Sequence, residues 1–374
     1  MIIILLIFLC FYGGLSIYAF FRAKDIFHFS GTTEVIIIIL LFFLILAPVI
    51  IRFTEKLHLE TLARSIAYFG YLWMAFVFLF FFLNITFDTA RYVFYFFCQS
   101  GENVLLKNIF FSLSVFLSFI FVVYGFFDAQ RIRIKRLEVY TDKLLPNNRK
   151  IRIVQISDVH IGLIIRDKRL KVILDRVKNE KPDILVSTGD LLDGELNNVM
   201  PETKQLAEIK PMYGKYAVPG NHEYYAGIKK ALEFTKNAGF EILRDENRRV
   251  AGINIIGLDD ITGRKLGLIQ NSTHLSELLR ATQNKEFIIL LKHQPDIHEN
   301  MNFNLQLSGH THDGQIFPFM LLTRLFFPQN YGYYKLGEDK SVYVSSGVGT
   351  WGPPVRFFAP PEITVIDLIG RKYN

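Results

Sequence analysis

The sequence predicts an α-helical membrane region of about four spans followed by an α/β domain. Two observations lead to this prediction. Long uncharged apolar runs are confined to residues 1–130 of the 374. From about Leu137 onward the apolar runs shorten, alternate with amphipathic stretches and end in turn residues. A mean hydropathy of +0.25, with 51% hydrophobic residues, also exceeds what an ordinary soluble domain requires.

The membrane region rests on four runs without a charged side chain, at 2–21, 35–51, 66–85 and 109–127. A bilayer core needs about 20 apolar residues in a helix, with a working range of about 17 to 25. The second run is the shortest and contains Pro48. Buried core helices are the alternative, but such helices rarely stay uncharged all round for five turns. The first run lacks the basic start of a signal peptide, so we expect an uncleaved anchor.

Charge placement predicts the orientation of a multi-pass protein of the cell membrane. Seven basic residues flank the spans on one side, namely Arg52, Lys56, Arg64, Arg131, Arg133, Lys135 and Arg136. Four lie on the other side, namely Arg22, Lys24, Arg91 and Lys107. This bias places the downstream domain in the cytoplasm.

The segment 131–150 is expected to connect the two regions, leaving 151–374 as the folded domain. Its cluster "RIRIKR" and the net charge of +7 suit anionic membrane lipids, and no nucleic-acid partner is expected. The only cysteines are Cys10 and Cys98, so the downstream half has neither a disulfide framework nor a cysteine nucleophile.

The downstream domain alternates predicted strands and helices. Strands are expected at 151–157, 182–189, 215–220, 250–258, 286–292, 303–308, 341–345 and 362–367. Helices are expected at 166–180, 201–209, 228–237 and 273–283. Alternation of this kind indicates an α/β domain around a parallel or mixed sheet, and the later strand-rich stretch suggests a second sheet.

Five of the predicted strands end in Asp, Asn or His. These residues are Asp158, His160, Asp190, Asn221, His222, His293, His310 and His312. Singly, Asp158 or Asp190 can cap a helix, Asn221 can serve a turn, and His293 can be a core histidine. Their shared position at strand ends, where open α/β sheets bind ligands, favours one site. The remaining histidines, His28, His58, His274 and His298, fall outside the pattern.

Without His222, this set offers two carboxylates, one amide and four imidazoles, and no thiolate. Such ligands suit Mn, Fe or Zn rather than a cysteine-based structural zinc site. Seven ligands are too many for one tetrahedral ion but fit two divalent ions that share a carboxylate. Two ions about 3.5–4 Å apart can clamp a phosphate and hold a hydroxide between them.

The ordered blocks "DVH", "GDLLD", "GNHE", "KHQP" and "GHTH" resemble the calcineurin-like metallophosphoesterase superfamily. The tail "YVSSGVGTWGPPVRFFAPPEI" resembles its membrane-linked bacterial branch. The resemblance covers roughly residues 138–374. It implies a four-layer sandwich of two mixed sheets flanked by helices.

The resemblance also implies a role for each site residue. The first ion would be held by Asp158, His160, Asp190 and His312, and the second by Asp190, Asn221, His293 and His310. His222 would protonate the leaving oxygen. Glu223 would contact the site residues without binding the metals itself.

Two departures from the pattern bear on the substrate. Asp313 stands where this branch usually repeats glycine and adds a negative charge near the metals. The superfamily's serine/threonine phosphatases place phosphate-gripping arginines where this chain has Gly194 and Pro219. A protein phosphatase is therefore disfavoured.

The function predicted is a membrane-anchored two-metal phosphoesterase with a metal-bridging hydroxide as nucleophile. Its substrate would be a phosphodiester or a pyrophosphate, with lipid-linked esters included. The alternative is a non-catalytic metal-binding membrane sensor or scaffold. A transport module is disfavoured because the spans hold almost no ionisable residue at their centres.

Two further segments are candidates for substrate contact. Arg356 follows "WGPP", a fixed turn from which an arginine can grip phosphate, although a surface salt bridge is the alternative. The stretch 316–334 is rich in Phe and Leu, and its prolines favour a loop or short helix. It is either ordinary core or an apolar lip in the lipid headgroup region, where Arg324 would meet a lipid phosphate.

Overall fold

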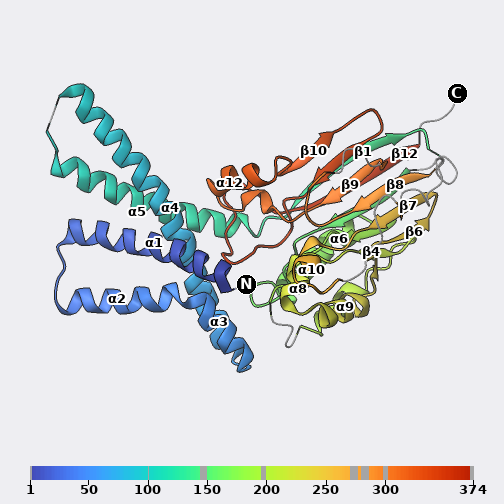
Figure 1. Ribbon diagram of the computed structural model, residues 1–374, viewed down its shortest axis with the longest axis horizontal. Coiled ribbons are helices and arrows are strands. Elements are labelled where there is room, and N and C mark those ends of the chain that lie inside the picture. The colour runs from blue at the N-terminus through green and yellow to red at the C-terminus, as the bar shows by residue number, and fades with distance from the viewer. Residues whose placement is uncertain are drawn as a thin grey trace. The chain divides into compact units, whose positions relative to one another are not determined.

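The computed structural model describes residues 2–99, 101–143, 150–194, 199–269, 277–278, 286–297 and 302–370. The chain divides into two compact units (Figure 1). The helical unit comprises Met1–Asp128 and Gly352–Phe357, and the sheet unit comprises Ala129–Trp351 and Phe358–Asn374.

The helical unit contains α1 (Ile2–Phe27), α2 (Thr32–Ile45), α3 (Ala47–Lys56), α4 (Glu60–Cys98) and α5 (Val104–Asp128). Three of these helices, α1, α4 and α5, are long and apolar enough to cross a membrane. The second predicted span is instead a pair, α2 and α3, bent by 57°. Pro48 lies in the first turn of α3, where its missing N–H and its ring prevent α2 from continuing. The described chain therefore has three candidate spans, or four if the bent pair is one span.

Polar side chains of α1 and α4 pair with one another. Arg22 Nη2 lies 2.7 Å from Asp88 Oδ2, and Arg91 Nη2 lies 3.1 Å from Asp88 Oδ1. Asn84 Oδ1 accepts hydrogen bonds of 2.9 Å from both Tyr18 and Arg22. Because α4 extends beyond the uncharged run 66–85, Asp88 and Arg91 lie outside that run and can hold α1 against α4.

The sheet unit contains two six-stranded mixed sheets (Figure 1). The first has the order β1 (Arg133–Thr141), β12 (Glu362–Gly370), β2 (Lys150–Ile156), β3 (Ile184–Ser187), β4 (Lys215–Ala217) and β5 (Glu241–Ile242). The second has the order β10 (Gly332–Lys335), β11 (Ser341–Val344), β9 (Leu305–Ser308), β8 (Phe287–Leu291), β7 (Ile253–Gly257) and β6 (Glu246–Val250). Strands β2, β3 and β4 are parallel, as are β7, β8 and β9. The predicted α/β fold with two mixed sheets is confirmed.

Part of the segment expected to be a connector is a strand. Residues Arg133–Thr141 form β1, which pairs in parallel with β12 along its whole length. Ile134, Leu137 and Val139 interrupt the charged side chains and pack toward the hydrophobic clusters of the sheet unit. Most of the basic cluster therefore belongs to an edge strand, on which its basic side chains remain exposed.

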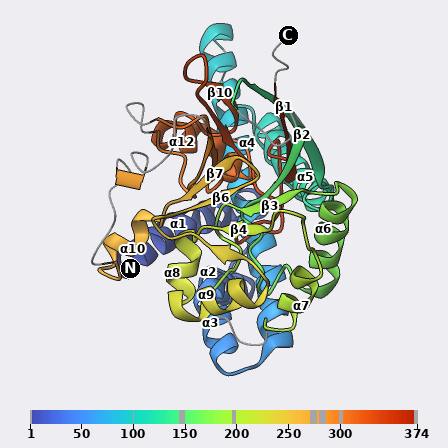
Figure 2. The ribbon, with the colours of Figure 1, turned by 90° about the vertical axis from the view of Figure 1, so that its right-hand side faces the viewer.

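Helices α6 (Asp167–Asn179), α7 (Glu202–Ala207) and α9 (Ile228–Asn237) cover one face of the first sheet (Figure 2). In α6 the buried positions Leu170, Ile173, Leu174 and Val177 follow helical spacing. A second hydrophobic cluster fills the space between the sheets, and a third covers the far face of the second sheet. The helix expected at 273–283 lies largely outside the described residues.

Four short helical segments were not predicted as such, although 316–334 was expected to hold a loop or a short helix. They are α8 (Asn221–Ala226), α10 (Ile261–Lys265), the 3-10 turn η2 (His312–Gly314) and α12 (Phe319–Phe326). Two of them, α8 and η2, begin at predicted metal ligands. Both sheets thus send the carboxyl ends of their parallel strands toward one group of polar residues.

Candidate metal centre

The structure brings together all seven side chains that were predicted to bind metal. Asp158 and His160 follow β2, Asp190 follows β3, and Asn221 begins α8 after β4. The second sheet contributes the remaining three, with His293 after β8 and both His310 and His312 after β9. Residues from two different sheets therefore meet at one place.

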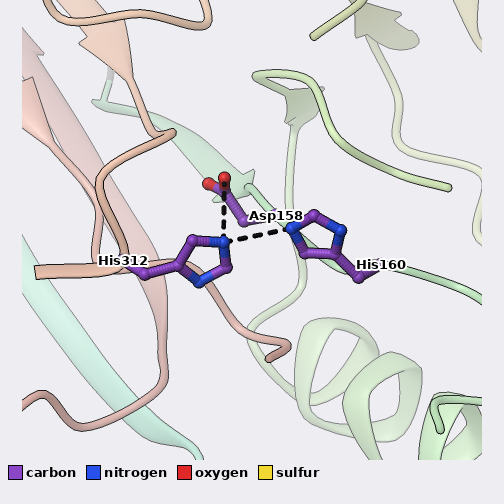
Figure 3. A group of neighbouring side chains, drawn as sticks. All are labelled: Asp158, His160 and His312. Carbon is purple, nitrogen blue, oxygen red and sulfur yellow. Dashed lines mark hydrogen bonds and ion pairs between the residues drawn. The ribbon is translucent and has the colours of Figure 1, made fainter. Parts of the chain in front are cut away.

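The first group consists of Asp158, His160 and His312, whose ligand atoms lie within 4.8 Å of one another (Figure 3). His160 Nε2 lies 3.0 Å from His312 Nε2, and His312 Nε2 lies 3.5 Å from Asp158 Oδ1. All three side chains point toward a common centre (Figure 3).

The second group consists of Asp190, His293 and His310. His293 Nε2 lies 3.2 Å from Asp190 Oδ2, 3.1 Å from His310 Nδ1 and 3.0 Å from Asn221 Oδ1. Asp190 Oδ2 is also 3.9 Å from His160 Nε2 of the first group. Asp190 therefore belongs to the second group and also lies against the first.

The chemistry of these groups fits divalent metal ions. His160 Nε2 faces His312 Nε2, and His293 Nε2 faces His310 Nδ1, so each pair of ring nitrogens can share one cation. His160 Nδ1 lies away from this contact, 3.8 Å from Asp193 Oδ1. The donors are nitrogen and oxygen only, as Mn, Fe and Zn accept.

The backbone at the site is strained. Five ligand residues have a positive φ between 50° and 74°, namely Asp158, His160, Asp190, His310 and His312. Residues other than glycine avoid this region. Each such residue costs of order 1–3 kcal/mol and persists only where the surrounding structure imposes the conformation. Such outliers cluster at functional sites, so the strain supports a functional role for these loops.

Two glycines of the motifs leave room for the carboxylates. A Cβ at Gly220 would overlap Asp190 Oδ1, and a Cβ at Gly309 would overlap Asp158 Oδ2. The glycines of "GNHE" and "SGH" are thus required by close approach to the ligands.

Burial and neighbouring charges set the protonation of the site without metal. Burial raises the pKa of Asp158 to about 6, and it lowers the pKa of His160 to about 4 and of His310 to about 3. Burial also acts to raise the pKa of Asp190, but His293 and His222 hold that pKa well below its usual value. His160 and His310 are therefore neutral at pH 7, as metal ligands must be.

One residue that the motifs did not predict, Asp193, contacts His222. Its Oδ1 lies 3.1 Å from His222 Nδ1. Burial opposes the charged imidazole, but Asp190 and Asp193 raise the pKa of His222 to about 9. The signal was present in the sequence, because Asp193 is the last residue of "GDLLD", on the same loop as Asp190.

Glu223 and Asp313 are both buried near the ligands. Glu223 accepts hydrogen bonds from the backbone N–H groups of Asp190, Leu192 and Gly220, at 3.0, 3.1 and 2.7 Å. Burial and Asp190 raise its pKa to about 7. Asp313 accepts a hydrogen bond of 2.6 Å from Asn330 Nδ2. Glu223 therefore fixes the loop of a predicted ligand, while the effect of Asp313 on the metals stays a prediction.

The two arginines predicted to contact substrate lie in different settings. Arg356 is fully buried and belongs to Gly352–Phe357 of the helical unit. Its backbone N–H donates to the Gly125 carbonyl at 2.9 Å, and the neighbouring Phe357 ring stacks on Phe121 with centroids 4.6 Å apart. Arg324 is exposed on α12. Their substrate roles stay predictions.

Comparison with known proteins identifies the family. Residues 151–314 match the calcineurin-like phosphoesterase family. An uncharacterised metallophosphoesterase of Aquifex aeolicus is 38% identical over 262 residues, which are 69% of this chain and 99% of that protein. The chain belongs to the calcineurin-like metallophosphoesterases. This membership implies metal-dependent hydrolysis of a phosphoester.

Other metallophosphoesterases similar to this chain come from bacteria and animals. An uncharacterised metallophosphoesterase of Campylobacter jejuni is 36% identical over 276 residues, covering 72% of each chain. A Danio rerio protein called a transmembrane protein with metallophosphoesterase domain is 32% identical, covering 68% of this chain and 62% of its own. The expected resemblance to a membrane-linked branch thus extends beyond bacteria.

Proposed function

We propose that this metallophosphoesterase is a membrane-anchored enzyme that uses two divalent ions to hydrolyse a phosphodiester or a pyrophosphate, lipid-linked esters included. The observation that supports it is that Asp190, a member of the second ligand group, also lies 3.9 Å from His160 of the first group, so one carboxylate can reach both groups. The apolar helices would anchor the enzyme, with the sheet unit in the cytoplasm as the basic flanks predict.

Two divalent ions, when bound, would activate the attacking water and neutralise charge on the phosphate. Asp190 would hold both ions, and the other six predicted ligands would be divided between them, three to each ion. His222 turns Nδ1 toward Asp193, so its Nε2 is left to carry the proton that the leaving oxygen takes up. Asp193 is a positioning residue, because it orients the imidazole and favours its charged form.

The test uses the full chain in detergent with Mn and a soluble aryl diester, bis(p-nitrophenyl) phosphate. We expect Asp190→Asn to lose measurable turnover and at least one bound metal. His222→Ala should keep both metals but lose turnover by about 10²–10⁴-fold, the range for a lost general acid. Asp175→Asn, at an exposed position on α6, is the matched control.

Unimpaired hydrolysis by Asp190→Asn would refute the two-metal proposal. Full activity of His222→Ala would remove His222 from the mechanism. A wild-type protein that binds both metals but hydrolyses neither diesters, monoesters nor pyrophosphates would favour the sensor or scaffold.

A further inference from the structure

The helix α12 exposes an apolar face to its surroundings. None of its residues is buried, and Leu325 and Phe326 are 78% and 72% exposed. Leu321, Leu322, Leu325 and Phe326 follow helical spacing, so they lie along one side of the helix. Met320 lies on a different side, against Gly314 of η2. The exposed stripe therefore faces away from the turn that carries His312.

This helix is attached to the metal centre at both ends. At its start, Gly314 has a positive φ of 72° and approaches the Met320 backbone so closely that a Cβ would overlap it. At its end, the Phe327 ring lies 5.2 Å from the His310 ring. Anything that binds the exposed face of α12 is thus held about one helix diameter from the metal ligands, or about 10 Å.

The apolar surface extends beyond α12 toward the start of β1. Phe317 and Phe358 are both exposed, and their rings pair with centroids 6.0 Å apart. Three residues after Phe358, the Pro361 carbonyl accepts a hydrogen bond of 2.9 Å from the Arg133 N–H. We call Phe317, Leu321, Leu322, Leu325, Phe326 and Phe358 the apolar face.

The surroundings of β1 favour a lipid bilayer as the occupant of the apolar face. Only residues 129–132 separate α5, a candidate span, from β1. Four residues reach at most about 14 Å, so β1 must begin close to the end of that span. Arg131, Arg133 and Lys135 are exposed there, as contact with anionic lipid headgroups requires. A protein partner would need no such basic border and no adjoining span.

We propose that the apolar face docks on the membrane surface and that the metal centre acts on phosphoesters presented at the headgroup level of lipids. This inference rests on the proposed function and specifies its substrate class. Large apolar side chains with a basic border are the composition of an interfacial membrane helix. Arg324, exposed on α12, would lie among the headgroup phosphates.

The docking is tested by fluorescence quenching, a measurement that does not depend on enzymatic activity. It uses the full chain in nanodiscs that contain anionic and brominated lipids. Leu325→Trp adds a fluorophore to the apolar face, and Met212→Trp adds one at an equally exposed position of the sheet unit (78%). After subtraction of the wild-type emission, we expect bromine to quench the fluorophore at 325 and not the one at 212. A fluorophore at 325 that is shielded from water but not quenched indicates a protein occupant, either a second copy or a partner, and overturns the docking. A fluorophore at 325 that remains exposed to water overturns the docking as well.

The substrate class is tested with two esters that release the same nitrophenolate, soluble bis(p-nitrophenyl) phosphate and vesicle-borne phosphatidyl-p-nitrophenol. Leu325→Asp with Phe326→Asp should lower the ratio of vesicle to soluble hydrolysis at least tenfold, while Met212→Asp should not change it. Equal losses on both esters, or wild-type hydrolysis of the soluble ester alone, overturn the substrate class. If the metal-loaded wild type hydrolyses neither ester, the substrate class is overturned. The proposed function fails only if monoesters and pyrophosphates are not hydrolysed either, and the quenching still decides the docking.

Discussion

At the scale of single residues, His222 and Asp193 form the pair whose protonation the structure describes most directly. The folded pKa of His222 is about 9, above its usual 6.5, because the charges of Asp190 and Asp193 outweigh burial. A raised pKa means that folding favours the imidazolium. The resulting stability is complete below about pH 6.5 and is lost as the pH rises through about 9. Without metal ions, His222 therefore carries its proton at neutral pH, as a general acid must.

This pairing predicts the pH profile of Asp193→Asn. Removing the carboxylate should lower the pKa of His222 by about one to three units, so the alkaline limb of kcat moves to lower pH. The measurement is kcat against pH for wild type and variant at saturating Mn. Asp175→Asn should leave the limb in place. A uniform drop in kcat with an unmoved limb would show that Asp193 does not act through His222.

At the scale of elements, the segment Gly352–Phe357 and α5 are packed through a glycine. A Cβ at Gly125 would lie 2.6 Å from Val355 Cγ1 and 2.9 Å from the Arg356 carbonyl oxygen. The tail that carries Arg356 belongs to the helical unit, and the substrate role of Arg356 stays a prediction. Close approach of the two backbones is what makes this burial possible.

We therefore predict that Gly125→Leu destabilises the protein by about 1–3 kcal/mol, the usual cost of overpacking. The measurement is thermal unfolding in detergent, where Tm should fall by a few degrees. Gly14→Leu is the matched control, because Gly14 lies in α1 and a Cβ there would meet nothing within 4 Å. Equal Tm values for the two variants would mean that the segment is not held through Gly125.

At the scale of the whole molecule, the bend between α2 and α3 decides the topology. If the pair crosses the membrane as one span, four crossings return the sheet unit to the side of the N-terminus. If the pair re-enters, three crossings place the two on opposite sides. With four crossings, seven basic residues flank the side of the sheet unit and four flank the other. With three crossings, Arg22 and Lys24 join the side of the sheet unit, and the count becomes nine against two. Both topologies therefore predict a cytoplasmic sheet unit.

The prediction is that a single cysteine at Met212, in a chain whose Cys10 and Cys98 are replaced by serine, resists a membrane-impermeant maleimide in intact cells. It should react once the cells are opened, because Met212 is exposed. A tag at the N-terminus, probed in the same cells, then shows on which side the N-terminus lies. The same side as the sheet unit means four crossings, and the opposite side means three. Labelling at 212 in intact cells would reverse the proposed orientation.

The sequence alone determined the two regions and predicted the ligand set. Uncharged runs and strand–helix alternation are local patterns, and local patterns determine where spans, strands and helices form. Because parallel strands place their carboxyl ends at one edge, Asp158 and Asp190 could be assigned to one site from their position in the chain. The bend at Pro48 was also foreseeable as the weak point of the second span.

Only the tertiary structure decided how these parts are combined. The division of the ligands around Asp190, the contact of Asp193 with His222, and the addition of β1 to the first sheet each join segments that are distant in sequence or differ in pattern. Positive φ at five ligands is imposed by surrounding contacts against local preference. The exposure of α12 and the burial of Arg356 depend on which surfaces meet. The type of a side chain, apolar or basic, does not determine which residues it contacts after folding.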